Sequence, residues 1–232
     1  MKERPVLFTP ANAQLVFDHR KTQTRRVITP QPFSFNDGEV TTWEHENING
    51  AYEEKVFAQR MRDYGPKPFG VVGDRLWVRE AWRPFYEKDT GAQGIQFKGG
   101  GFEENDRAGE AANGTDKWRH ARFMFRWCSR TLLEITDIRV ERLQSISEED
   151  AIAEGVSATP YSKQDIADIQ ISDCAPEIKQ LAAILGPGQF TAKANYMMLW
   201  DSINGLRYNW SSNPWVWSIH FKRLEAWPNS TV

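Results

Sequence analysis

Hydrophobic positions alternate with polar ones in several short stretches of the chain, which is typical of strands. At residues 75–81, we expect Leu76 and Val78 to face inward and Trp77 and Arg79 to face outward. Strands are also predicted over residues 21–28, 122–127, 131–142 and 215–224. So many short strands indicate a fold built mainly on sheet.

Two of these predicted strands carry further information. Over residues 122–127 the side chains of Phe123, Phe125 and Trp127 fall on one face, which we expect to be buried. Over residues 131–142 the apolar positions shift from odd to even numbers, as a bulge or a barrel corner requires. The second strand is therefore expected to curve.

End signals and apolar spacing predict three helices. Thr9 and Pro10 open the first helix, which continues for about two to three turns. Ser147 caps a short second helix that runs through Glu154 and stops at Gly155. The third helix covers residues 192–204, and its expected apolar stripe consists of Tyr196, Leu199, Trp200 and Ile203.

The predicted strands and helices do not alternate regularly, so a doubly wound parallel sheet is not expected. The predicted fold class is α+β, a small mixed β-barrel with flanking short helices. Three stretches rich in glycine, proline or polar residues, at residues 29–70, 84–117 and 157–189, are interpreted as insertions. They belong to a single expected domain that covers residues 1–232.

Composition excludes several classes of protein. The 232-residue chain has 29 Lys and Arg against 31 Asp and Glu, and a net charge of -2 argues against a polycation that coats nucleic acid. Cys128 and Cys174 lack the spacing of a zinc site or a disulfide framework, and the four histidines share no ligand spacing. No stretch approaches the roughly 18 apolar residues of a membrane span. A soluble cytoplasmic protein without metal or other cofactor is expected.

Basic residues are nevertheless concentrated in two stretches. The first surrounds two threonines with Arg20, Lys21, Arg25 and Arg26. The second interleaves aromatic residues with Arg119, Arg122, Arg126 and Arg130 and contains no acid. One interpretation is that guanidinium groups bind phosphate while a ring stacks on a base, a contact that contributes about 1–3 kcal/mol per base. The alternative is that the arginines pair with neighbouring acids and the rings belong to the core.

Several segments taken in order resemble ASCH domains, which belong to the PUA-like barrels. They are residues 20–26 (RKTQTRR), 72–79 (VGDRLWVR), 132–143 (LLEITDIRVERL), 147–155 (SEEDAIAEG), 199–204 (LWDSIN) and 213–224 (NPWVWSIHFKRL). The chain looks most similar to ASCH proteins carried by tailed phages and prophages, which would place it in the host cytoplasm. The resemblance implies that the protein handles RNA, nucleosides or modified bases.

Some small bacterial ASCH relatives are amidohydrolases that remove the acetyl group from acetylcytidine. The resemblance places Lys21, Thr24 and Glu154 at the catalytic lysine, threonine and glutamate of that group. Thr24 would attack the amide, Lys21 would take its proton, and Glu154 would orient the pair or pass a proton to the departing amine. Positions three apart on a regular strand face opposite sides, so Lys21 has to lie in the turn before the strand.

Three functions remain open from the sequence. The leading expectation is an amidohydrolase that acts on acylated cytidine. The alternative is a non-catalytic RNA- or DNA-binding module that recognises a modified base, for which the candidate residues are Arg20, Arg25, Arg26, Trp77, Arg79, Arg122 and Arg126. The third is a ribonuclease that uses the same lysine and glutamate. The expected partner is a nucleoside or a single-stranded nucleic acid, with no membrane and no metal, and the oligomeric state is left open.

Overall fold

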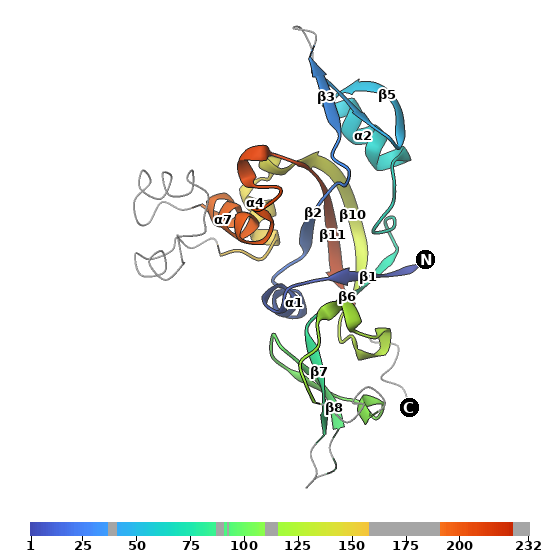
Figure 1. Cartoon of the computed structure of the whole chain (residues 1–232), viewed down its shortest axis with the longest axis vertical. Coiled ribbons are helices and arrows are strands. Elements are labelled where there is room, and N and C mark those ends of the chain that lie inside the picture. The colour runs from blue at the N-terminus through green and yellow to red at the C-terminus, as the bar shows by residue number, and fades with distance from the viewer. Residues whose placement is uncertain (37–40, 87–90, 92, 110–115, 158–190, 225–232) are drawn as a thin grey trace. The chain divides into compact units, whose positions relative to one another are not determined.

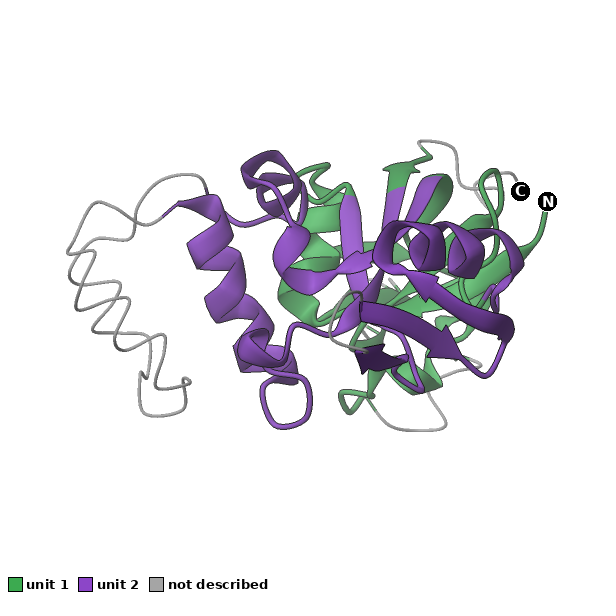
Figure 2. Ribbon diagram, turned by 90° about the horizontal axis from the view of Figure 1, so that it is seen from above, with its two compact units in different colours: residues 1–22, 68–136, 221–232 green, residues 23–67, 137–220 purple. Residues whose placement is uncertain are grey.

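The computed structural model describes residues 1–36, 41–86, 91, 93–109, 116–157 and 191–224 (Figure 1). Apart from residue 157, the predicted insertion at residues 157–189 lies outside the described residues, as does Cys174. The chain folds into two compact units, which Figure 2 shows in different colours. Unit 1 comprises residues 1–22, 68–136 and 221–232, and unit 2 comprises residues 23–67 and 137–220.

Five strands form a mixed sheet in the order β1-β6-β10-β11-β2. They are β1 (Glu3–Leu7), β6 (Arg75–Arg79), β10 (Leu132–Arg142), β11 (Trp215–Arg223) and β2 (Gln23–Val27). The pair β1 and β6 is parallel, whereas β10 pairs with β6 and β11 with β2 in antiparallel fashion. The α+β class is confirmed. The expected closed barrel is not found in the described chain, because β1 and β2 are the edges of this sheet and closure requires edge strands to pair.

The burial along β6 follows the predicted alternation, with Leu76 and Val78 buried and Trp77 and Arg79 partly exposed. Along β10 the buried positions shift from odd to even numbers as expected, since Leu133 and Ile135 are buried in its first half and Val140 in its second. Strands β10 and β11 each run from one unit into the other. The single domain therefore stays a prediction.

In unit 1, α1 (Pro10–Phe17) begins as the sequence indicates, because the Thr9 side chain accepts a hydrogen bond from the Asn12 amide at 3.3 Å. The stretch interpreted as an insertion at residues 84–117 contributes to a three-stranded antiparallel sheet of β7 (Trp82–Tyr86), β8 (Gln93–Phe97) and β9 (Phe102–Glu104). This sheet packs on a core cluster that consists of Trp82, Ile95, Phe97, Ala108, Met124 and Cys128.

The strand predicted over residues 122–127 is wrong. Two short 3-10 helices stand there instead, η1 (Ala121–Phe123) and η2 (Arg126–Cys128). Phe123 and Phe125 are 64% and 50% exposed, whereas Met124 is buried. Tight turns bury residues three or four apart rather than alternate ones, so the core takes Ala121, Met124 and Cys128 and leaves the two phenylalanines outside.

In unit 2, the stretch at residues 29–70 forms a second antiparallel sheet and a helix. The elements are β3 (Phe33–Asn36), β4 (Thr41–His45), β5 (Ile48–Glu53) and α2 (Glu54–Tyr64). Helix α2 buries Phe57 and Met61, which lie one turn apart, and the Phe57 ring packs at 4.8 Å from the Trp215 ring. This part of the chain thus packs on β11 of the five-stranded sheet through Phe57.

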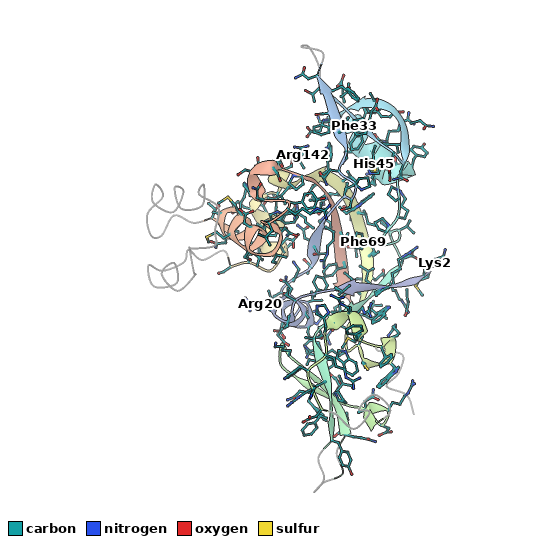
Figure 3. The ribbon with its side chains drawn as sticks, in the orientation of Figure 1. Lys2, Arg20, Phe33, His45, Phe69 and Arg142 are labelled. Atoms are coloured by element: carbon teal, nitrogen blue, oxygen red, sulfur yellow. The ribbon has the colours of Figure 1, made fainter. Side chains whose placement is uncertain are left out.

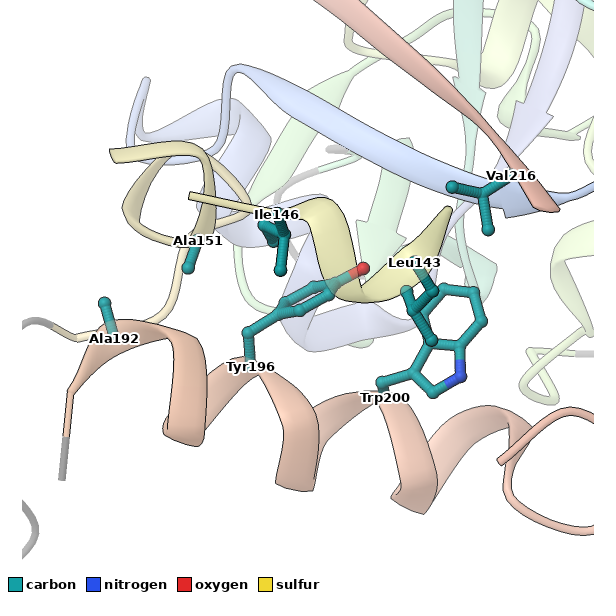
Figure 4. Packing of buried hydrophobic residues seen from close by; sticks show 7 residues of the cluster. All are labelled: Leu143, Ile146, Ala151, Ala192, Tyr196, Trp200 and Val216. Carbon is teal, nitrogen blue, oxygen red and sulfur yellow. The ribbon is translucent and has the colours of Figure 1, made fainter. Parts of the chain in front are cut away.

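Two helices with a shared core complete unit 2. Helix α4 (Glu148–Ala153) has Ser147 as its N-cap, and α7 (Ala192–Asn204) has the predicted bounds. Figure 4 shows Tyr196 and Trp200 projecting from α7 among Leu143, Ile146 and Val216. The expected apolar stripe is wrong at Ile203, which is 50% exposed because it lies beyond the end of this cluster. None of the helices within the described ranges is long and apolar enough to cross a membrane.

Candidate functional site

The turn between α1 and β2 positions Lys21. After α1 ends, His19 adopts a positive φ of 59°, and the amides of Arg20 and Lys21 both donate to the Leu15 carbonyl, at 2.9 and 3.1 Å. Strand β2 begins only at Gln23, so Lys21 lies in the turn, as the catalytic hypothesis requires. The Lys21 side chain is buried, whereas Arg20 is exposed at the end of α1 (Figure 3).

Strand β2 presents buried polar side chains at its start. Gln23, Thr24 and Arg25 are all at most 4% exposed, which is uncommon for a run of three polar residues. Thr24 lies opposite Ile219 in the antiparallel pair with β11. The Gln23 side-chain amide donates to the Asp150 carbonyl at 2.9 Å, so β2 is hydrogen-bonded to helix α4.

Arg25 is the centre of a buried ionic cluster within unit 2. Its Nη2 atom lies 2.6 Å from Glu141 Oε1 and 3.0 Å from Asp150 Oδ2, and its Nη1 atom lies 3.2 Å from Glu154 Oε1. The Tyr196 hydroxyl donates to Glu154 Oε1 at 3.4 Å. We call these five residues the Arg25 cluster. The Arg25 side chain is 0% exposed and its guanidinium is shared by three carboxylates, so it offers no surface to a phosphate.

Burial and the neighbouring charges set the protonation of this cluster. Burial lowers the pKa of Arg25, but Glu154 and Glu141 outweigh burial, and the net pKa is raised. Burial lowers the pKa of Arg26, and Glu154 only partly offsets that effect. Burial, followed by the Glu154 charge, raises the pKa of Tyr196 well above its usual value. The Tyr196 hydroxyl therefore keeps its proton and acts as a donor.

Glu154 ends α4, where its carboxylate faces the negative end of the helix dipole at a cost of about 0.3–1 kcal/mol. A carboxylate in this position is stabilised by a cationic partner. Arg25 fills that role within unit 2, together with the hydroxyl of Tyr196. No sequence signal points to Tyr196 or Glu141, because they lie on α7 and β10, far from Arg25 along the chain.

Four of the predicted nucleic-acid-binding residues lie together in unit 1. The guanidinium carbons of Arg79 and Arg126 are 5.3 and 5.9 Å from the centre of the Trp77 ring. Arg79 also donates to the backbone carbonyls of Arg122 and Met124, which holds η1 against the outward side of β6. The Arg122 guanidinium carbon is 5.8 Å from the ring of Phe123. We call Trp77, Arg79, Arg122, Phe123 and Arg126 the Trp77 patch.

Among the described residues, Glu3 pairs with an arginine of this patch. Arg126 donates to Glu3 Oε2 at 2.6 and 2.8 Å, in a pair that is about one-third exposed. Arg122 is exposed and makes no ion pair with any described residue. Arg130, from the same basic stretch, differs from both, because it is buried and donates to the two carboxylate oxygens of Glu80 at 2.9 and 3.0 Å.

Further rings extend the exposed aromatic surface of unit 1. Trp118 is 43% exposed, and the Arg83 guanidinium carbon lies 4.9 Å from its ring centre. The rings of Phe125 and Trp127 are parallel, with centroids 5.8 Å apart. Arg107 lies over Trp127 at 4.7 Å. Arginine next to an aromatic ring is thus the common local arrangement here, and such pairs are used to recognise bases and phosphates.

The described residues contain no group of three or more His, Cys, Asp or Glu side chains placed to hold a metal ion. The acids of the Arg25 cluster converge on a guanidinium instead. The functional candidates are therefore the buried cluster in unit 2 and the exposed patch in unit 1. Comparisons of this chain with family models, with curated proteins and with solved structures found no match.

Proposed function

We propose that this chain binds single-stranded nucleic acid through the Trp77 patch. The observation that carries the proposal is the convergence of Arg79, Arg122 and Arg126 on the rings of Trp77 and Phe123 within unit 1. Guanidinium groups are suited to phosphate because they donate two parallel hydrogen bonds to its oxygens. Rings beside them can stack on bases.

The local charge supports this proposal although the whole chain has a net charge of -2. No acidic residue stands between Asp116 and Glu134, and the basic residues of that stretch are Lys117, Arg119, Arg122, Arg126 and Arg130. Glu80 neutralises Arg130, but the pair of Arg126 with Glu3 is partly exposed and screened by salt. A phosphate chain therefore meets a positive surface here.

The exposed rings favour a single strand over a duplex. Phe123 and Phe125 each expose half of their surface or more, and exposed apolar area of this kind marks interaction sites. Base faces are accessible to a ring only where bases are unstacked, as in single-stranded segments. A duplex would offer phosphates to the arginines and leave the rings without partners.

Fluorescence anisotropy with a labelled single strand, titrated at several salt concentrations, tests the proposal. We expect Arg122→Gln to weaken binding and to reduce the slope of log affinity against log salt by about 0.7, the value for one phosphate contact of a single strand. Arg139→Gln is the matched control, since Arg139 is half exposed in unit 2 and pairs there with Asp137 and Asp150, away from the Trp77 patch. No binding of the wild type at low salt, or equal slopes for the two variants, would refute it.

We also propose that the fold is of the PUA-like ASCH type. The order of elements supports this, because the resembling segments correspond to β2, β6, β10, α4, the end of α7, and β11. They make up most of the five-stranded sheet together with the helices next to it. An experimental structure superimposed on ASCH domains tests this assignment, and a different strand order in those domains would overturn it.

A second function, removal of an acyl group from the amine of cytidine, has an observation in its favour. Lys21 precedes the first residue of β2, so the objection from strand geometry does not apply, and Lys21, Thr24 and Glu154 are all buried. Chromatography of acetylcytidine incubated with wild type, Lys21→Ala and Thr24→Ala tests it. Turnover by the wild type and none by the variants is expected, and no product from nucleosides or RNA would rule it out.

A further inference from the structure

Unit 2 contains a polar pocket that belongs neither to the Arg25 cluster nor to the Trp77 patch. It lies between the turn that joins β4 to β5 and helix α2, and it has an open volume of about 350 Å³. Its walls include Glu46, Asn47, Asn49, Tyr52, Arg60 and Tyr64. This volume lies within the range of small-molecule sites, roughly 300–1,000 Å³.

The positively charged group of this pocket is a guanidinium close to two aromatic rings. The Arg60 guanidinium carbon is 5.2 Å from the ring centre of Tyr52 and 5.5 Å from that of Tyr64. Arg60 and Tyr64 lie one turn apart on α2, so the helix sets their spacing. Arg60 makes no ion pair or hydrogen bond with any residue that the structure describes. Its hydrogen-bond donors therefore remain for an acceptor from outside the protein.

The wall opposite α2 is fixed by local structure. Gly50 has a φ of +95°, and a Cβ atom there would lie 3.1 Å from the Tyr52 hydroxyl oxygen. Glycine at this position of β5 thus leaves room for the Tyr52 ring, whose hydroxyl donates to the Asn49 carbonyl at 2.5 Å. Tyr52 is held in this position before any ligand arrives, and a preorganised wall lowers the entropy cost of binding.

We propose that this pocket binds a nucleoside monophosphate, with the phosphate on Arg60 and the base against Tyr64. A guanidinium without an acidic partner favours a phosphate, and a tyrosine that is 71% exposed offers a face for a flat ring. The Asn49 side chain can donate to or accept from the polar edge of a base, and the Glu46 carboxylate can accept from it. Because Glu46 adds a negative charge to the wall, one phosphate fits better than several.

Two kinds of ligand carry one phosphate next to a base: a free mononucleotide and the phosphorylated end of a nucleic-acid strand. The pocket lies wholly in unit 2 and goes beyond the proposed function, since none of its residues belongs to the Trp77 patch. Every measurement can be repeated in the Arg122→Gln variant. A failure of the Trp77 patch would then leave the result for the pocket unaffected.

Isothermal titration calorimetry with three probes tests the proposal: a nucleoside 5′-monophosphate, the same nucleoside, and inorganic phosphate. We expect the monophosphate to bind at least about tenfold more tightly than either part, and Arg60→Gln to weaken it at least about tenfold. Tyr64→Leu should weaken the monophosphate and leave inorganic phosphate unchanged. Arg62→Gln is the control, because Arg62 lies exposed on the same helix and pairs with Asp63.

Equal affinity for the monophosphate and inorganic phosphate, or equal affinities in Arg60→Gln and Arg62→Gln, would overturn the proposal. So would the absence of heat with all three probes. Arg60 and Tyr64 are exposed, and thermal melts of the variants check that folding is unchanged. Competition by a short strand with a 5′-phosphate, compared with the same strand ending in a hydroxyl, distinguishes a strand end from a free nucleotide as the source.

Discussion

Arginine has opposite environments in the two units. In unit 2, Arg25 is 0% exposed and contacts three carboxylates. In unit 1, Arg122 is exposed beside a ring and makes no ion pair with a described residue. Both belong to stretches of sequence that are rich in arginine and free of acids. The comparison teaches that local sequence charge does not identify a phosphate-binding arginine, because acids distant in sequence decide which arginines are already paired.

This difference separates a structural role from a binding role. Removal of one partner from a buried ion pair leaves an uncompensated charge in a medium where charge is costly. Removal of an exposed arginine leaves nothing behind that water cannot solvate. Variants in the two regions should therefore affect different measurements.

The largest effect is expected for Arg25→Met. This change removes the buried cation of Glu141 and Glu154 and leaves Asp150 with only the exposed Arg139 at 3.7 Å, so the free energy of unfolding should fall by about 3–5 kcal/mol. Urea unfolding followed by circular dichroism measures it. A loss below about 1 kcal/mol would show that the cluster is not a closed buried unit, and the comparison would fail.

Phe123→Ala should have an intermediate effect, on binding alone. Loss of the exposed ring should weaken single-strand binding by about 1–3 kcal/mol while the free energy of unfolding changes by less than about 0.5 kcal/mol. Its salt dependence should match that of the wild type, since no phosphate contact is removed. Unchanged affinity would remove Phe123 from the Trp77 patch.

Tyr196→Phe tests how the Arg25 cluster contributes to the pH dependence of stability. Loss of the hydrogen bond to Glu154 should lower the free energy of unfolding by about 0.5–1.5 kcal/mol at neutral pH. The folded-state pKa of Tyr196 is raised, whereas in the unfolded chain this tyrosine titrates near its usual value of about 10. Its contribution to stability is therefore complete below about pH 10 and is lost as the pH rises further.

The wild type should thus lose stability at alkaline pH, and Tyr196→Phe should lose less of it over the same interval. Denaturant titrations at a series of alkaline pH values measure both. Tyr86→Phe is the matched control, because Tyr86 is 61% exposed. Parallel pH profiles for wild type and Tyr196→Phe would contradict the expected role of the phenol.

The smallest effect is expected on the stability of Arg122→Gln. The side chain is exposed and its only described contact is with the ring of Phe123, so the free energy of unfolding should change by less than about 0.5 kcal/mol. Thermal melts of this variant beside Arg25→Met give the contrast directly. A large loss for Arg122→Gln would mean that the patch is structural.

Capping residues and apolar spacing were sufficient to predict the helices whose ends are set by a few residues. Ser147 accepts from the Asp150 amide as a cap should, and α7 has the bounds that its apolar spacing predicts. The segment at residues 121–128 was not predictable in this way, because its aromatic residues alternate like those of a strand. Only the tertiary contacts of Met124 and Cys128 show which side of that segment is buried.

The candidate sites likewise contain residues that the sequence identifies and residues that only the fold brings together. Four residues of the Trp77 patch were named from charge and aromatic content, whereas Phe123 was expected to be buried and is exposed. Their approach to one another required the packing of η1 on β6. The partners of Arg25 could not be named, since Glu141 and Asp150 lie 116 and 125 residues away in sequence. The pocket around Arg60 lies in the stretch at residues 29–70, whose composition predicts an insertion and gives no sign of a binding site.

Cys128 gives the segment that carries Phe123 and Arg126 a natural reporter. Burial raises the pKa of its thiol to about 12, and the side chain is 3% exposed, so alkylating reagents find almost no thiolate while unit 1 is folded. The rate of Cys128 alkylation therefore measures how often this core opens and exposes the thiol. With Cys174 replaced by serine, a bound strand that holds the segment closed would slow that rate, and occupancy could be followed without a label on the nucleic acid.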